Sequence, residues 1–251
     1  MKISEGIYMM EVKAKVMGNE VSIFPSLMYD AQGGTLVDAG YPGQAEPIIT
    51  EIIKCGAAPE KIDRLFITHQ DIDHIGSAQA LLAKLSPSVK VYSGEVEREF
   101  IEGKKLLEKV TPEAIAKALN ALPPNMPDEQ KRAFKFRLEN PPTVNVDEIL
   151  PIDEEMPVHG GMVVVPTYGH TSGHLSFYHK NSKTFIAGDC LKAVDGVLAA
   201  PTSCTDYKQA IESLKRLLYF DIESVICYHG GYCSGNVMGM IEDILNGFEN
   251  G

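Results

Sequence analysis

Four side chains that can bind a metal ion lie within six residues of the sequence. These side chains are His69, Asp71, Asp73 and His74. The apolar run before them, residues 65–68, predicts a buried strand, and apolar residues at helical spacing over 75–85 predict a helix after them. The chain must therefore fold so that one strand-to-helix loop presents all four side chains, and four such residues at this spacing favour a metal site.

Later apolar runs end in the same way. The runs 162–168, 184–187 and 224–228 each predict a strand, and a potential ligand follows each of them. These ligands are His170, Asp189 and His229. Because α/β folds build their sites at the ends of strands, we expect these side chains to reach the 69–74 loop.

Short strand candidates alternate with amphipathic helices, and no fixed-period repeat is present, so the sequence predicts a layered α/β fold. A length of 251 residues and a hydrophobic content of 44% are ordinary for a globular protein with a sizeable core. We predict a single domain over residues 1–251. Within it, helical spacing at 95–109, 111–121 and 128–138 predicts a helical insertion or cap over residues 94–150, whose side chains either contact the substrate or form the insertion's own core.

Charge and cysteine content restrict the partners and the compartment. The net charge of −11 argues against binding to nucleic acid or to an anionic membrane, because both depend on clustered Lys and Arg. The five cysteines form no C-x-x-C pair, which fits a reducing compartment. No apolar stretch has the length of a signal peptide or a membrane span, so we expect a cytoplasmic protein with a small-molecule substrate. Cys190, directly after Asp189, is either an ordinary buried thiol or a neighbour that tunes a metal site.

In their order along the chain, these motifs resemble those of the metallo-β-lactamase superfamily. The family's H-x-H-x-D-H motif corresponds to residues 69–74, its G-H-T-x-G-H motif to residues 169–174, its G-D motif to Gly188-Asp189, and its last histidine to His229. The resemblance spans nearly the whole chain. It implies an α/β fold of four layers, an αββα sandwich, with a metal centre at the edge of the sheets.

The resemblance also implies the ligands of two divalent metal ions. They are His69, Asp71 and His170 for the first ion, Asp73, His74 and His229 for the second, and Asp189 between both. Of the two histidines in the 169–174 motif, the resemblance makes His170 the ligand and places His174 beside the site without direct binding.

One position departs from the family pattern, because Asp71 stands where the family has its second histidine. Two divalent ions and a bridging hydroxide leave the site formally neutral when three aspartates bind, whereas histidine at 71 would leave one positive charge. The additional carboxylate is expected to weaken the Lewis acidity of the site and to shift its preference toward iron or manganese alongside zinc. The family's flavodiiron members carry a carboxylate at this position and hold iron. Zinc remains the first expectation for a hydrolase.

The expected activity is metal-dependent hydrolysis of a small ester, thioester or lactone, in which a metal-bridging hydroxide attacks the carbonyl and Asp73 orients the water. A diiron redox protein without its flavin domain is one alternative, suggested by Asp71. A metal-containing ligand sensor without catalysis is another, because a fold alone does not fix a function. Dimers are common in the superfamily, so a homodimer is also an expectation.

Overall fold

Mixed β-sheets face each other in the computed structural model, which describes residues 1–16 and 18–249. Met17 and the last two residues of the predicted 1–251 domain lie outside the described residues. The parallel pairs of the first sheet are β6 with β7, β7 with β8, and β8 with β9. In spatial order, its strands are β1 (Lys2–Ser4), β2 (Ile7–Met9), β5 (Ser26–Asp30), β6 (Gly33–Val37), β7 (Ile62–Phe66), β8 (Lys90–Ser93) and β9 (Glu148–Ile149).

The second sheet is built from the later part of the chain, and β13 pairs with β16 in parallel. In spatial order, its strands are β10 (Glu155–Met156), β11 (Met162–Pro166), β12 (Leu175–His179), β13 (Thr184–Gly188), β16 (Ser224–Cys227) and β17 (Gly231–Ser234). Separate hairpins are formed by β3 (Val12–Val16) with β4 (Asn19–Ile23), and by β14 (Lys192–Val194) with β15 (Val197–Ala199).

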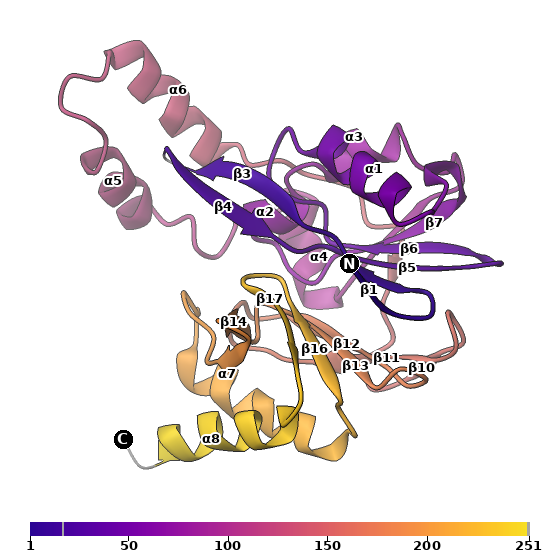
Figure 1. Cartoon of the computed structure of the whole chain (residues 1–251). Coiled ribbons are helices and arrows are strands. Elements are labelled where there is room, and N and C mark those ends of the chain that lie inside the picture. Colours follow the sequence, from indigo (N-terminus) through magenta and orange to yellow (C-terminus); the bar gives the residue numbers. More distant parts are fainter. Residues whose placement is uncertain (17, 250–251) are drawn as a thin grey trace.

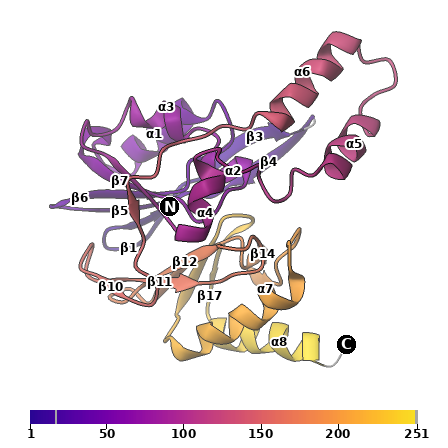
Figure 2. The same ribbon diagram turned by 180° about the vertical axis from the view of Figure 1, so that it is seen from behind.

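Helices cover the outer faces of both sheets (Figure 1), and the view from behind shows the same layering (Figure 2). On the first sheet lie α1 (Ala45–Lys54) and α3 (Ala78–Leu82). The short helix α2 (Ile72–Ile75) follows β7, the 3-10 turn Pro59–Lys61 precedes this strand, and α4 (Glu95–Ile101) lies next to the second sheet (Figure 2). On the second sheet lie α7 (Tyr207–Leu214), the 3-10 turn Lys215–Tyr219 and α8 (Val237–Glu249). None of the helices among residues 1–16 and 18–249 combines the length and the apolar composition that a membrane span requires.

Successive side chains of a strand point to opposite faces, and this alternation builds the layers. Phe66 of β7 packs between the sheets with Phe177 of β12, at a ring-centroid distance of 5.3 Å. Its neighbour Leu65 points the other way and packs with Ile48 and Ile52 of α1. The second sheet behaves alike, because Ile186 faces the first sheet while Phe185 packs under the α7–α8 layer. These three apolar interfaces confirm the predicted αββα sandwich.

The segment predicted as a helical insertion joins β8 to its neighbour β9. It contains α4, α5 (Pro112–Asn120) and α6 (Asp128–Glu139), and the last two project from the sandwich as a hairpin (Figure 1). The Thr111 hydroxyl accepts a hydrogen bond from the Ala114 N–H at 3.1 Å and caps α5. That this segment is an insertion into the fold stays a prediction.

The helix expected over 95–109 was predicted too long. It ends at Ile101, and Gly103 follows with φ +73°, the left-handed conformation that terminates many helices. The N–H of Lys104 then turns back to the carbonyl of Glu99 at 2.8 Å. As a result, residues 102–110 are not helical and cross the edge of the sandwich.

Candidate metal centre

The candidate ligands lie where strands of both sheets end at one edge of the sandwich. The loop after β7 carries His69 and Asp71, and α2 carries Asp73 and His74. In the second sheet, the loop after β11 carries His170, the end of β13 leads to Asp189, and the end of β16 leads to His229. Both parallel pairs, β6 with β7 and β13 with β16, direct their carboxyl ends to this edge, so all seven predicted side chains meet there.

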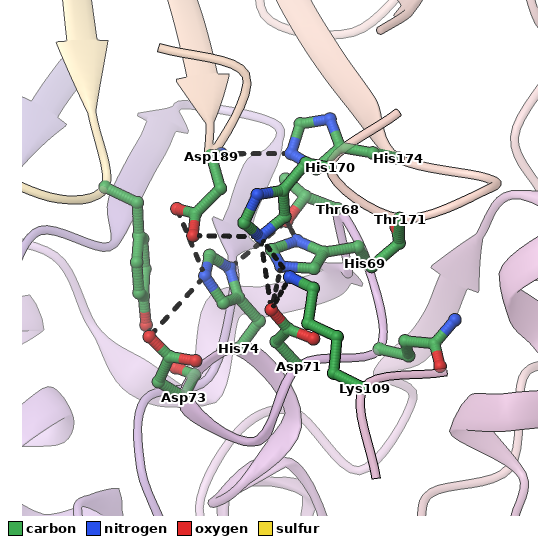
Figure 3. A network of polar contacts seen from close by, with 12 residues as sticks. Thr68, His69, Asp71, Asp73, His74, Lys109, His170, Thr171, His174 and Asp189 are labelled. Atoms are coloured by element: carbon green, nitrogen blue, oxygen red, sulfur yellow. Dashed lines mark hydrogen bonds and ion pairs between the residues drawn. The ribbon is translucent and has the colours of Figure 1, made fainter. Parts of the chain in front are cut away.

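A first cluster is formed by His69, Asp71, His170 and Asp189, each of which offers a ligand atom within 4.8 Å of the others. The Oδ2 atom of Asp71 lies 3.3 Å from Nε2 of His69 and 3.1 Å from Nε2 of His170. Nε2 of His170 also lies 3.3 Å from Oδ2 of Asp189 (Figure 3). Nitrogen and oxygen donors from three separate strand ends thus converge on one point.

A second cluster adjoins the first and contains Asp73, His74 and His229. Nε2 of His229 lies 3.2 Å from Oδ2 of Asp73 and 3.3 Å from Oδ2 of Asp189. Nε2 of His74 lies 3.4 Å from Oδ1 of Asp189. Asp189 therefore contacts histidines of both clusters.

The spacing of these atoms fits a pair of bound metal ions. An ion held tetrahedrally at about 2.0–2.1 Å from each ligand separates its ligand atoms by about 3.3 Å, which matches the contacts within both clusters. Among the described residues, the buried Nε2 atoms of His69 and His74 and Oδ1 of Asp189 have no hydrogen-bond partner. Buried polar atoms without partners are costly, and one metal ion in each cluster would satisfy all three.

Hydrogen bonds behind the clusters turn the histidine lone pairs inward. Nδ1 of His74 donates to Oδ2 of Asp38 at 2.8 Å. The Thr68 hydroxyl donates to the same carboxylate at 2.9 Å, and its oxygen then accepts from Nδ1 of His69 at 2.9 Å. With Nδ1 hydrogen-bonded in this way, each ring directs its Nε2 atom at the clusters, the arrangement that metal-binding histidines use.

His174 has no ring nitrogen left for a metal. Its Nδ1 lies 2.8 Å from the Thr167 hydroxyl, and its Nε2 accepts from the backbone N–H of Asp189 at 2.9 Å. His174 therefore positions the chain at Asp189, while His170 points into the first cluster as the family resemblance implied. The Cys190 sulfur accepts a hydrogen bond from the Ser176 hydroxyl at 3.4 Å, and burial raises the pKa of this thiol to about 12, so it stays protonated at pH 7.

Burial and charge set the protonation of the clusters without metal. Burial lowers the pKa of His69 to about 4, so its ring is neutral at pH 7. Burial acts to raise the pKa of Asp71, but His69, His170 and Lys109 outweigh it and hold the pKa well below its ordinary value. Burial acts to lower the pKa of His229, whereas the carboxylates of Asp189 and Asp73 raise it to about 9.

A sequence model of the Metallo-beta-lactamase superfamily matches residues 19–229 of this chain. The chain belongs to this superfamily. The match includes the whole 69–74 loop, the 169–174 motif and His229, so the sequence resemblance is confirmed. Relatives of this chain are named probable metallo-hydrolases, and the paired clusters described above supply donor atoms that a metal-dependent hydrolase requires.

Relatives of this superfamily member cover most of its length. The probable metallo-hydrolase YflN of Bacillus subtilis is 24% identical over 220 residues, which cover 82% of this chain and 79% of that protein. The metallo-beta-lactamase fold-containing protein ST1585 of Sulfurisphaera tokodaii is 28% identical over 184 residues, which cover 71% of this chain and 64% of that protein. The metallo-beta-lactamase from Pontibacter korlensis has a TM-score of 0.67 and 17% identity, covering 98% of this chain and 97% of that chain, a likeness that shows the fold.

Two further residues of this superfamily member lie at the site, and the sequence analysis missed both. The fully buried Glu97 joins the two ligand loops, because its carboxylate accepts from the Gln70 N–H at 2.9 Å and from the Thr171 hydroxyl at 2.7 Å. Burial raises the pKa of Glu97 to about 7. Lys109 reaches the first cluster itself. Gly103 was the sequence signal that could have predicted an earlier end of the helix expected over 95–109, and so a position for Lys109 outside it.

Proposed function

We propose that this chain is a two-metal hydrolase of a small ester, thioester or lactone. The observation that carries the proposal is the position of Asp189 between the clusters. Its Oδ2 lies 3.3 Å from His170 and 3.3 Å from His229, while its Oδ1 lies 3.4 Å from His74. A carboxylate shared in this way is suited to hold two ions close together.

The protein would hold one ion by the first cluster and one by the second, with Asp189 contributing to both. When bound, the two ions supply activated water at neutral pH and polarise the carbonyl of the substrate. Zinc is the first expectation, because buried imidazoles and carboxylates in this spacing are ligands that zinc accepts.

Asp73 is proposed to orient the attacking water. Its Oδ2 lies 3.2 Å from Nε2 of His229 and faces the second cluster. A carboxylate in this position can accept a hydrogen bond from the water and carry its proton. The Asp73 side chain is 15% exposed, which leaves it within reach of solvent. The net charge of −11 supports a small-molecule substrate over a nucleic acid.

Asp71 favours a second candidate function, that of a diiron redox protein. Its carboxylate lies among the donor atoms of the first cluster, at the position where the family pattern has histidine, and an oxygen ligand increases the preference for iron. This function would require a separate reductase to supply electrons.

Metal analysis and a substrate panel test these proposals together. Protein purified without added metal is analysed for zinc, iron and manganese, and is then loaded with each metal and assayed on a nitrophenyl ester, a thioester and a lactone. Colourless protein with two zinc ions per chain and turnover of one compound is expected. An iron pair whose spectrum changes with dithionite would favour the redox function, and two bound ions without any turnover would contradict the hydrolase proposal.

Asp71→His is a matched variant for the choice of metal. The change restores the family's histidine and is expected to raise zinc occupancy relative to iron under defined loading. An unchanged zinc-to-iron ratio would show that Asp71 does not contact a metal.

A further inference from the structure

Lys109 places its ammonium group inside the first cluster (Figure 3). Its Nζ lies 2.5 Å from Oδ2 of Asp71 and 2.7 Å from Nε2 of His170. These are two of the atoms that the proposed function gives to the first metal ion. The Lys109 side chain is 24% exposed and is therefore only partly buried.

The residue before Lys109 is tied to both loops that carry ligands of the first cluster. The backbone N–H of Glu108 donates to Oε1 of Gln70 at 2.6 Å. The carboxylate of Glu108 accepts from the backbone N–H of Ser172 at 3.0 Å and from the Ser172 hydroxyl. Because Gln70 adjoins His69 and Asp71 in sequence, these bonds hold position 109 over the cluster.

The ammonium and a metal ion require the same atom of His170. The Nε2 atom of an imidazole has a single lone pair, which lies in the plane of the ring and either accepts a hydrogen bond or binds a metal. A hydrogen bond from Lys109 uses that lone pair. The side chain must therefore leave His170 before an ion can bind there, and its partial exposure gives it a path toward solvent.

The positive charge of Lys109 also compensates for the carboxylate that replaces the family's histidine at position 71. A carboxylate in place of a neutral histidine adds one negative charge to the first cluster, and Lys109 lies on that same carboxylate with one positive charge. The second cluster contains Asp73, His74 and His229, and the contacts of Lys109 with ligand atoms are on the first cluster. The two clusters are thus unequal before any metal binds.

We propose that Lys109 is an internal competitor for the first metal site, so that the second cluster loads first and the first cluster binds its ion more weakly. The inference rests on the proposed function only in taking both clusters as metal sites. It concerns the order and strength of metal binding, which can be measured without any substrate.

Zinc titration against a chromophoric chelator tests the proposal on the full chain. The wild type is expected to bind two ions in well-separated steps. Lys109→Met removes the charge and keeps an unbranched side chain that is one atom shorter. The weaker step should tighten by about tenfold or more, the scale on which neighbouring groups tune metal affinity. Lys109→Arg should keep the weak step. Equal binding constants in the wild type and Lys109→Met would overturn the proposal.

Lys105→Met is the matched control, because Lys105 lies on the same segment and pairs with Glu99 at the surface at 2.6 Å. It should leave both steps unchanged, and thermal unfolding of each variant checks the fold. Amine labelling of the wild type, located by mass spectrometry, is independent of any variant. Labelling of Lys109 should accelerate when the second ion binds, and an unchanged rate with two ions bound would also overturn the proposal.

The outcomes separate this inference from the proposed function. A shifted weak step in Lys109→Met without turnover of any substrate would support the role of Lys109 and contradict the hydrolase. If the enzyme turned over a substrate, and wild type and Lys109→Met bound both ions with equal constants, the hydrolase proposal would be supported and the role of Lys109 contradicted. If neither protein bound a second ion, the competitor role and the two-metal site would both be wrong.

Discussion

The Asp38 carboxylate accepts a hydrogen bond from Nδ1 of His74 at 2.8 Å, across 36 positions of sequence. Oδ1 of Asp38 also accepts from the backbone N–H of Thr68 at 2.9 Å. Asp38 has φ +66°, a conformation that Asp and Asn adopt more readily than most residues. One buried carboxylate at the end of β6 thus orients a candidate ligand of the second cluster.

Asp38→Asn should weaken zinc binding to the second cluster by about 10- to 100-fold, because the neutral amide holds the His74 ring less firmly and lowers its basicity. Asparagine tolerates the left-handed backbone, so the fold should persist. Chelator competition measures the affinity. The control is Asp30→Asn, which breaks the equivalent 3.0 Å contact with His159, outside both clusters. Equal losses in both variants would contradict the role of Asp38.

Asp73→Asn should reduce kcat by about 10²- to 10⁴-fold, because the amide cannot take a proton from the attacking water. The rate is measured on the best substrate of the panel, with metal content determined in the same sample. Asp63→Asn is the control, since Asp63 pairs with Arg64 at the surface of β7. A near-wild-type rate at full metal content would remove Asp73 from its proposed role.

Metal uptake should depend on pH through His229. Because its pKa is raised to about 9 in the metal-free protein, His229 is protonated at pH 7 and must lose that proton to bind a metal. Burial acts to lower the pKa of His74, but Asp38, Asp189 and Asp73 hold it well above its ordinary value, so His74 must lose a proton as well. Affinity should therefore rise with pH above pH 7, by roughly tenfold per unit for each proton displaced. Calorimetry at pH 7 in two buffers of different ionisation enthalpy measures the proton release. Identical heats of binding in both buffers would show that no proton is released and would contradict the prediction.

Gly230→Ala should disturb the hairpin that carries His229. Gly230 has φ +90°, and a Cβ there would lie 1.8 Å from the carbonyl oxygen of Ala193. Gly235→Ala is a control matched in backbone, with φ +95° and no atom within 4 Å of its Cβ. In both variants, alanine in a left-handed backbone conformation costs about 1–2 kcal/mol of folding free energy. Only at position 230 does the added Cβ also clash with another atom. Thermal unfolding and zinc stoichiometry should show a larger loss in Gly230→Ala, and equal losses would show that the clash relaxes.

Local sequence pattern predicted the layers and the ligands because both have short-range signatures. The apolar run 65–68 predicted a buried strand, and in the structure its adjacent residues Leu65 and Phe66 point to opposite faces. The loop at 69–74 and the strand ends before His170, Asp189 and His229 could be located in the same way, since apolar runs mark where strands stop. The resemblance to the superfamily then ordered these ends around one centre.

Asp38, Glu97 and Lys109 could not be found from the sequence, because their partners are distant along the chain. Glu97 is one acid in an amphipathic helix, where solvated carboxylates are common, and only packing buries it between the loops of Gln70 and Thr171. Lys109 was predicted at the end of a helix that stops at Ile101.

The sequence by itself indicated a layered α/β fold, because hydrophobic periodicity is a property of short segments. The order of its motifs, through the resemblance to the superfamily, implied the αββα class and the chemical kinds of the candidate ligands. The tertiary structure alone decided which acids support the histidines and which cation lies on Asp71. Those contacts join segments 27 to 74 positions apart, and their geometry depends on how both sheets pack rather than on any local preference of the backbone.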